Sequence, residues 1–501
     1  MPQSHGSQLH ELTALELAAA FRCGQTTPRE VVDHLLERID AFSVAVGAFV
    51  TVTPEAARDQ ADRCGLLLRD RDANIPLLLG VPTAVKDLNN TAGVRTTYGS
   101  AVTVDTVPQV SDEVVLRMER AGMVSLGKTN TPEFGSPCYT EPEVAPPART
   151  PYDLDRSAGG SSGGAGAAVA AGLLPVAQGS DGGGSIRIPA SVCGLVGIKP
   201  SRGRISTAPL FGDVSGLGTA GPLATTVRDA AAMLDALCGP TVGDPAWAPP
   251  LPPDESYLGW ADRPPGRLRI ARCCAPPIGD GDLHPQVRAG YDAATRLLTE
   301  LGHDVVDVDL ALPPTTLEVF ETVWSVSAAA WPIDPAREPE LRPLSQWLRS
   351  RGRDTAGPAF VGALVGMRQA AAAVLRTLSP YDAVLTPTLA QPPALVGELR
   401  DDDDPARDFE NQKGFTPFTA IWNVTGMPAV SLPMHWTSLR EEPNARATAS
   451  VLPVGMMLAG RPGDDHGLVA LAAQIESACV VQGRWPHPET PFSTAHAWSP
   501  A

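Results

Sequence analysis

The chain has 501 residues, of which 43% are hydrophobic and 19% charged, and its net charge is −17. This composition is typical of a globular protein, and the negative charge argues against binding to nucleic acids or anionic membranes, which need clustered Lys and Arg. The eight cysteines include no CxxC pair, so neither a disulfide framework nor a metal site is expected. Because the first residues also lack the pattern of a secretory signal, we expect a cytoplasmic enzyme.

The first forty residues predict two helices, each opened by a capping box. Thr13 with Glu16, and Thr27 with Glu30, have the spacing at which two residues cap each other's backbone. Farther along, short apolar segments alternate with helical periodicity, which predicts an α/β architecture. The apolar segments are 77–85, 123–126, 268–271, 304–310, 383–386, 430–433 and 453–458, and the helical ones are 112–120, 165–174, 227–237, 285–301, 311–380 and 467–479.

Three short motifs in this chain match patterns from enzymes with different activities. Residues 122–129 match the phosphate loop G-x-x-x-x-G-K-[ST]. A true phosphate loop follows a strand and leads into a helix, whereas the residues inside this match have the apolar pattern of a strand. Ser125 and Lys128 match the S-x-x-K of β-lactamases, yet in a strand these side chains point to opposite faces. Residues 159–163 match the G-x-S-x-G nucleophile elbow, but the polar segment 151–156 replaces the expected hydrophobic strand. The downstream histidines that an elbow could use are His435, His466, His487 and His496.

Two serine–glycine clusters, around Ser161 and Ser185, flank the alanine-rich stretch 165–174. Small residues allow such a helix to pack closely against neighbouring backbone, which can bring its two ends into one site. Glycines beside Ser185 would let backbone N–H groups approach a reacting carbonyl oxygen, as an oxyanion hole requires. The alternative interpretation is a glycine-rich turn with incidental serines.

These clusters and several other motifs together resemble the amidase signature family. The resemblance covers about residues 10–480. The matching runs are Gly80–Asp87, Gly127–Asn130, Ala158–Gly172, Gly179–Ala190, Cys193–Pro200, Gly221–Ala224, Pro428–Pro433 and Pro453–Gly455.

The resemblance implies one large domain over 1–501, with a mixed, twisted central β-sheet covered by helices on both faces. Within it, about 80–240 would be the signature core and about 381–480 would complete that core. The variable region 311–380 would shape the substrate pocket. A small-molecule amide would be the substrate, without a cofactor or a metal, and a homodimer is one expectation for the oligomeric state.

The resemblance also implies a Ser–Ser–Lys triad. Ser185 would be the nucleophile, Ser161 the bridging serine and Lys86 the base, with a cis peptide bond between Gly160 and Ser161. Lysine is a base only when neutral, and burial can lower its pKa from about 10.4 far enough. The oxyanion would be held by the N–H groups of Gly182, Gly183, Gly184 and Ser185.

Other residues have supporting roles in this interpretation. Ser162 would hydrogen-bond the lysine or the bridging serine, or else be a turn serine. Asp181 and Arg187 would pair to brace the nucleophile loop. The candidate pocket residues, some of which could equally pack in the core, are Ser136, Cys138, Tyr139, Trp324, Trp331, Trp422 and Asn423.

One departure concerns Gly182, where many relatives carry threonine in a Gly-Thr-Asp-Thr-Gly-Gly-Ser run. The form found here, with residues 140–143 upstream, most resembles the branch of 6-aminohexanoate cyclic dimer hydrolases. The expected activity is hydrolysis of a carboxylic amide through an acyl-enzyme on Ser185. The alternatives are the glutamine-hydrolysing subunit of an aminoacyl-tRNA amidotransferase and a non-catalytic binding module. The presence of all three triad residues disfavours the binding module.

Overall fold

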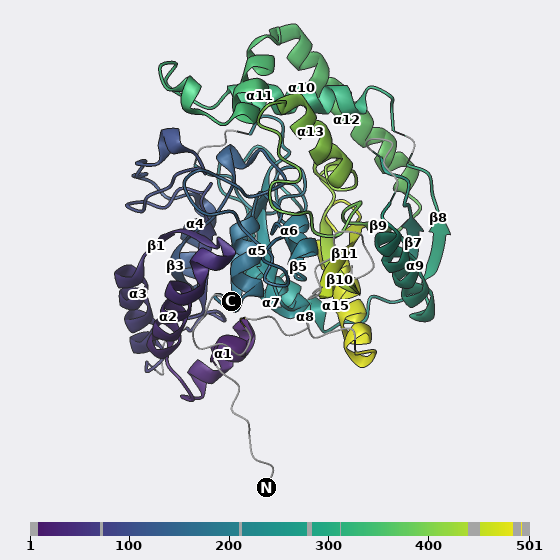
Figure 1. The fold of residues 1–501 in the computed structure, drawn as a ribbon. Helices are drawn as coiled ribbons and strands as arrows, with labels where there is room; N and C mark the ends of the chain where they lie inside the picture. The colour runs from purple at the N-terminus through teal and green to yellow at the C-terminus, as the bar shows by residue number, and fades with distance from the viewer. Residues whose placement is uncertain are drawn as a thin grey trace.

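The structure, a computed structural model, describes residues 9–70, 74–209, 213–277, 283–310, 312–438, 451–483 and 492, whose strands form two sheets (Figure 1). The strands are β1 (Phe49–Val52), β2 (Pro82–Lys86), β3 (Val124–Thr129), β4 (Val176–Asp181), β5 (Val196–Lys199), β6 (Thr219–Ala224), β7 (Arg269–Arg272), β8 (Asp304–Asp307), β9 (Ala383–Pro387), β10 (Ala429–Ser438) and β11 (Val451–Gly460).

The larger sheet has eight strands in the order β4-β6-β5-β10-β11-β9-β7-β8. Neighbours from β4 to β9 pair antiparallel, whereas β9, β7 and β8 pair parallel, so the sheet is mixed. Strands from the first half of the chain (β4, β6 and β5) lie on one side of this sheet and those from the second half on the other, and the two groups join where β5 pairs with β10. The predicted α/β class with a mixed sheet flanked by helices is confirmed.

The helices surround these sheets (Figure 1). They are α1 (Ala14–Arg22), α2 (Pro28–Val46), α3 (Pro54–Leu67), α4 (Glu113–Arg120), α5 (Gly163–Ala170), α6 (Arg187–Val192), α7 (Val227–Leu237), α8 (Tyr257–Ala261), α9 (Pro285–Glu300), α10 (Thr316–Ala329), α11 (Pro343–Arg353), α12 (Gly357–Leu378), α13 (Pro405–Phe415), α14 (Ile421–Thr425) and α15 (Asp465–Val481). Both predicted capping boxes are present, at the starts of α1 and α2.

Strand β11 shows how both faces of the large sheet are buried. Met456 and Leu458 belong to one hydrophobic cluster, which also contains residues of α9 and α15. Met457 and Ala459 belong to a second cluster, with residues of α10, α12 and α14. Because successive side chains of a strand point to opposite faces, this alternation places helices on both sides of the sheet.

The second sheet, β1-β3-β2, was not part of the sequence-based expectation. It pairs β1 with β3 antiparallel and β2 with β3 parallel. Lys86 is the last residue of β2, so the predicted base is carried by this small sheet. Ser185 follows β4 of the large sheet, and the predicted triad therefore joins two sheets.

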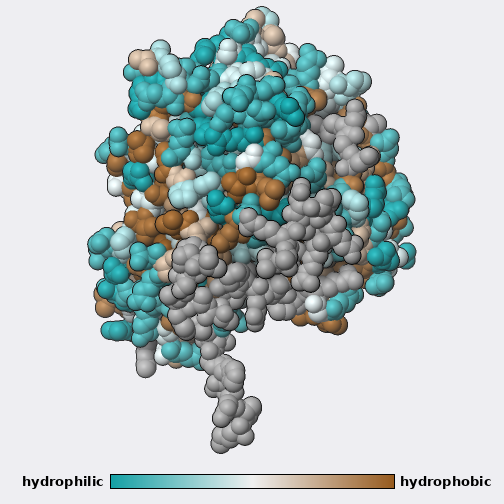
Figure 2. Space-filling view, in the orientation of Figure 1, coloured by the Kyte–Doolittle hydropathy of each residue, from teal (hydrophilic) through white to brown (hydrophobic). Residues whose placement is uncertain are grey.

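Hydrophilic residues cover the upper part of the face in Figure 2, and apolar residues gather in patches below them. The described helix α12 is long and apolar enough to span a membrane by those two measures alone, which core helices of other proteins also satisfy. Its buried residues, Ala363, Met367, Ala370, Val374 and Leu378, recur at helical spacing.

Candidate active site

Lys86 is completely buried, and hydroxyl groups surround its amine. Its Nζ lies 2.8 Å from Ser161 Oγ, 3.1 Å from Ser180 Oγ and 3.3 Å from the carbonyl oxygen of Ser180. The backbone N–H of Lys86 donates to Gln178 Oε1 at 2.8 Å, which fixes the end of β2 to β4. The predicted base and the predicted bridging serine are thus in direct contact.

Burial lowers the pKa of Lys86 from its usual value to about 7, although the charge of Asp181 partly opposes this shift. A neutral amine has two N–H donors and one lone pair. Two donors can serve the two oxygens of Ser180, which leaves the lone pair for the hydroxyl of Ser161. An unprotonated lysine can therefore make all three contacts of Nζ.

Ser161 and Ser162 lie in the turn before α5, and the Gly160–Ser161 peptide bond is cis, as the resemblance implies. Ser162 differs from the expectation that it bonds the lysine or the bridging serine. Its Oγ donates to the carbonyl oxygen of Ser180 at 3.1 Å, and its backbone N–H donates to the carbonyl oxygen of Ser185 at 3.1 Å. Ser162 thus links the turn to β4 and to the segment of the predicted nucleophile.

The small residues of α5 allow this turn to lie close to its neighbours. A Cβ atom at Gly163 would lie 2.4 Å from Thr140 Oγ1, and one at Gly164 would lie 2.3 Å from the backbone nitrogen of Asn130. Larger residues would push α5 away from the loop after β3. The glycines therefore help to hold Ser161 against Lys86.

Ser185 lies in the loop between β4 and α6 and faces a cavity. Among the three preceding glycines, Gly184 differs from the expectation that its N–H binds an oxyanion. That N–H donates to Asp181 Oδ1 at 2.8 Å and is therefore already engaged. In the described part of the chain, no protein group accepts a hydrogen bond from the N–H of Gly182, Gly183 or Ser185.

Asp181 and Arg187 form a fully buried ion pair beside this loop. Arg187 Nε and Nη2 donate to the two carboxylate oxygens of Asp181 at 2.9 and 2.8 Å. Burial alone would raise the pKa of Asp181, but the charge and hydrogen bonds of Arg187 outweigh it and hold that pKa well below its usual range. The predicted pairing of these two side chains is present.

The cavity beside Ser185 has about 570 Å³ of empty space, part of which is open to solvent. Three of the predicted pocket residues line it: Ser136, Cys138 and Trp324. Burial raises the pKa of the Cys138 thiol far above its usual value, so this cysteine is a neutral wall residue. Gly183 and Ser185, predicted for other roles, also line it, and the lining is completed by residues that the sequence analysis did not single out, namely Pro137, Ile188, Leu317, Phe320, Phe409, Gln412, Lys413, Thr416 and Ala420.

The other four predicted pocket residues lie elsewhere, so those assignments are corrected. The hydroxyl of Tyr139 donates to Asp408 Oδ2 at 2.6 Å behind the cavity wall. Trp331 stacks on a phenylalanine in a separate hydrophobic cluster, with ring centroids 4.8 Å apart. Trp422 is a core residue, and Asn423 contacts the Asp181–Arg187 pair. Tryptophan fills cores more readily than it lines pockets, which explains two of these errors.

The charged and amide side chains of the cavity wall already have hydrogen-bond or ion-pair partners. The amine of Lys413, which lines it, lies 2.5 Å from Glu321 Oε1 and 2.6 Å from Glu410 Oε1. Gln412 uses both ends of its amide, accepting from the backbone N–H of Cys138 and donating to a carboxylate. The charged and amide groups of the wall are therefore engaged by other protein groups, and the remaining lining is mostly apolar.

The phosphate-loop and S-x-x-K matches lie largely on a strand, and the described histidines of the elbow alternative contact other groups. Residues Val124–Thr129 form β3, and Lys128 is buried with its Nζ 2.6 Å from the carbonyl oxygen of Asn89. His466 contacts Asp464 at 3.2 Å, and His435 lies 3.5 Å from an amide oxygen on α9. His487 and His496 lie outside the described residues. Among the residues that the structure describes, no group of three or more His, Cys, Asp or Glu could hold a metal ion.

A family model described as Amidase matches residues 30–469. The chain belongs to the amidase family. This amidase is 34% identical over 492 residues to the 6-aminohexanoate-cyclic-dimer hydrolase of Paenarthrobacter ureafaciens, and the alignment covers 94% of this chain and 95% of the relative. It is accordingly a hydrolase of carbon–nitrogen bonds other than peptide bonds.

Solved structures agree with this membership. A 6-aminohexanoate cyclic dimer hydrolase superposes with a TM-score of 0.85 at 32% identity, covering 94% of this amidase and 98% of that chain. A bacterial aryl acylamidase of the amidase signature family superposes with a TM-score of 0.82 at 26% identity, covering 95% and 97%. The predicted resemblance to the cyclic dimer hydrolases is confirmed as a similarity of sequence and fold.

Proposed function

We propose that this amidase hydrolyses a carboxylic amide through an acyl-enzyme on Ser185, with Ser161 as the bridging serine and Lys86 as the base. The observation that carries the proposal is the 2.8 Å contact between Lys86 Nζ and Ser161 Oγ. Burial lowers the pKa of this lysine to about 7, so much of it is neutral at physiological pH. A neutral amine beside a hydroxyl is the arrangement that a proton relay needs.

In the first half-reaction, Ser185 Oγ attacks the carbonyl carbon of the amide. Its proton passes to Ser161, whose own proton passes to Lys86. When the carbon–nitrogen bond breaks, Ser161 gives a proton to the leaving amine and regains one from Lys86. An amide nitrogen is a poor leaving group unless it is protonated, so the relay acts in both directions.

In the second half-reaction, water attacks the acyl-enzyme along the same relay and releases the carboxylic acid. The negative oxygen that forms in each half-reaction requires hydrogen-bond donors. We assign this role to the N–H groups of Gly182, Gly183 and Ser185, because the N–H of Gly184 is engaged by Asp181. Preorganised donors of this kind contribute about 3–4 kcal/mol each to catalysis.

The lining of the cavity supports an uncharged, largely apolar acyl group. Leu317, Phe320 and Trp324 form one wall beside Ser185, and the rings of Phe320 and Trp324 stack with centroids 5.5 Å apart. Lys413 is neutralised by two carboxylates and is not available to hold an acidic substrate. Burying apolar surface here is favourable by about 25 cal/mol per Å².

The same lining disfavours the glutamine-hydrolysing subunit of an amidotransferase. Glutamine carries a free ammonium and a free carboxylate, and each would need an unengaged charged partner in the cavity. The one charged side chain found among the described lining residues, Lys413, already has two carboxylate partners. A free amidase fits this cavity better.

We also propose that the chain acts as one catalytic domain. Strands β4 and β6 from the first half and β9 to β11 from the second half belong to one sheet. The loop of Ser185 also contacts Thr419 and Asn423 near α14. Neither half contains the whole site.

The proposal is tested by screening amides of aliphatic, aryl and cyclic acids with the wild-type protein and Ser185→Ala. The acid and amine products are measured by mass spectrometry. We expect the wild type to release both products from amides with apolar acyl groups and Ser185→Ala to release neither. Equal turnover by Ser185→Ala would refute the assignment of the nucleophile.

A further inference from the structure

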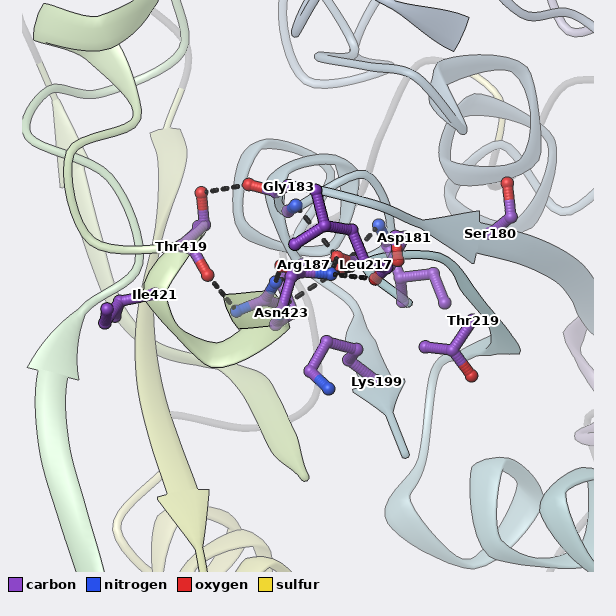
Figure 3. Close-up of polar contacts among 12 residues, drawn as sticks. Ser180, Asp181, Gly183, Arg187, Lys199, Leu217, Thr219, Thr419, Ile421 and Asn423 are labelled. Atoms are coloured by element: carbon purple, nitrogen blue, oxygen red, sulfur yellow. Dashed lines mark hydrogen bonds and ion pairs between the residues drawn. The ribbon is translucent and has the colours of Figure 1, made fainter. Parts of the chain in front are cut away.

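Thr419, which precedes α14, contacts the loop of Ser185 from the opposite half of the chain (Figure 3). Its hydroxyl donates to the carbonyl oxygen of Gly183 at 2.6 Å, with a longer contact of 3.4 Å to the carbonyl oxygen of Thr416. The backbone carbonyl of Thr419 accepts from Arg187 Nη1 at 2.8 Å. Thr419 is completely buried, so water does not compete for these contacts.

Asn423, four residues farther along, contacts the same loop through the Asp181–Arg187 pair (Figure 3). Its Oδ1 accepts from Arg187 Nη2 at 2.7 Å, and its Nδ2 donates to Asp181 Oδ1 at 2.8 Å. That same carboxylate oxygen accepts the N–H of Gly184. Asn423 therefore helps to fix the carboxylate that holds the glycine segment.

These contacts hold the peptide unit between Gly183 and Gly184 at both ends. Its carbonyl oxygen is bound by Thr419, and its N–H is bound by Asp181. Gly184 has φ +135°, a conformation that side chains rarely adopt, and a Cβ there would lie 2.5 Å from Thr419 Oγ1. Two successive glycines rotate freely unless such contacts restrain them.

The peptide units on either side carry the N–H groups of Gly183 and Ser185, which the proposed function assigns to oxyanion binding. Fixing the central unit restricts the directions that both can take. We propose that Thr419 is a positioning residue, whose hydroxyl holds the Gly183–Gly184 peptide so that these N–H groups face the reacting carbonyl. This inference rests on the proposed function, because it presupposes an oxyanion formed next to Ser185.

The test removes the hydroxyl of Thr419 while keeping the size of the side chain. Thr419→Val should lower kcat about 10- to 100-fold, because small misplacements of catalytic groups cost rate in this range. KM for an amide substrate should stay within about twofold, since the contact acts mainly in the transition state. The inhibition constant of a trifluoromethyl ketone analogue should rise by the same factor as kcat falls. Thr419→Ser keeps the hydroxyl and should restore activity.

Thr425→Val is the matched control, since this buried threonine of α14 bonds the carbonyl oxygen of Ile421 in its own helix. It should keep wild-type kcat. A Thr419→Val enzyme with wild-type kcat, or with a raised KM and unchanged kcat, would overturn the inference. So would loss of folding in both Thr419→Val and Thr419→Ala, because the hydroxyl would then be a requirement of the fold.

The Ser185→Ala variant separates this inference from the proposed function. If Ser185→Ala is inactive while Thr419→Val behaves as wild type, only the role of Thr419 is wrong. If Ser185→Ala retains turnover, the proposed function is wrong, and the role of Thr419 that rests on it is wrong as well.

Discussion

Lys86 Nζ and Ser161 Oγ lie 2.8 Å apart, although 75 residues separate them in the sequence. The lysine ends β2 of the small sheet, and the serine begins the turn before α5. Both are buried, so the contact lies in a region of low dielectric, where a charged amine is disfavoured. Burial therefore favours the neutral form of this lysine, which is the form that the proposed base requires.

Replacing the base should remove most of the activity. Lys86→Met keeps a long apolar stem but has no amine, and we expect kcat/KM to fall about 10³- to 10⁴-fold, the upper part of the range for general-base catalysis. Lys128→Met is a matched control, because Lys128 is another buried lysine, on the neighbouring strand β3. Steady-state kinetics on one amide would measure both. Equal losses in the two variants would contradict a specific role for Lys86.

The kcat/KM of the enzyme should rise with pH. Only neutral Lys86 accepts a proton, and its pKa is lowered to about 7, so kcat/KM should increase through this pH and level off above it. Burial also lowers the pKa of Lys199 to about 7 and that of Lys128 to about 8. Because we assign the rise in kcat/KM to Lys86, the Lys128→Met enzyme should show the same rise. A flat profile from about pH 5 to 9, with chemistry limiting the rate, would argue against a lysine base.

The free energy of unfolding should rise with pH above about pH 7. The pKa of Lys86 is about 7 in the folded state and near its usual value of 10.5 when unfolded. Between these values the unfolded chain binds one more proton, so the free energy of unfolding increases with pH, and below about pH 7 this contribution is constant. One lysine contributes about 1.4 kcal/mol per pH unit. Urea unfolding from about pH 7.5 to 9.5 should therefore give a smaller slope for Lys86→Met than for the wild type; equal slopes would contradict the burial argument.

Acyl selectivity should depend on Trp324 and Gly182. Trp324→Ala removes apolar wall area and should cost about 1–3 kcal/mol in kcat/KM, roughly 5- to 150-fold, for bulky apolar acyl groups but little for acetyl amides. A Cβ at Gly182 would lie 3.8 Å from the indole, an ordinary contact, so Gly182→Ala should fold and disfavour bulky acyl groups. Trp331→Ala is the matched control, because that indole packs in a separate cluster. Altered selectivity in Trp331→Ala alone would contradict this description of the cavity.

Local signals in the sequence predicted several helices well. The capping boxes at Thr13 and Thr27 mark the starts of α1 and α2 because the cap residues and the helix they open are adjacent. Strand β4 gave no such signal: Gln178, Gly179 and Ser180 interrupt any alternating pattern. It becomes a strand by pairing with β6, from which α6 and β5 separate it in the sequence.

Most of the site residues that could be predicted from the sequence belong to the motifs of the family. The resemblance places Lys86, Ser161 and Ser185 together, which no periodicity could do. Ser180, whose hydroxyl also contacts the lysine, was not among the predicted site residues. Thr419 gave no signal of its own, since its role depends on a contact between distant halves of the chain.

The most direct test of the account is the site of covalent labelling. The protein is treated with a fluorophosphonate, which reacts with activated serines, and the modified peptide is identified by mass spectrometry. We predict one adduct on Ser185, whose rate of formation rises through about pH 7, and no adduct in the Ser185→Ala variant. An adduct on another residue of the wild type, or equal labelling of Ser185→Ala, would contradict the assignment of Ser185 as the nucleophile.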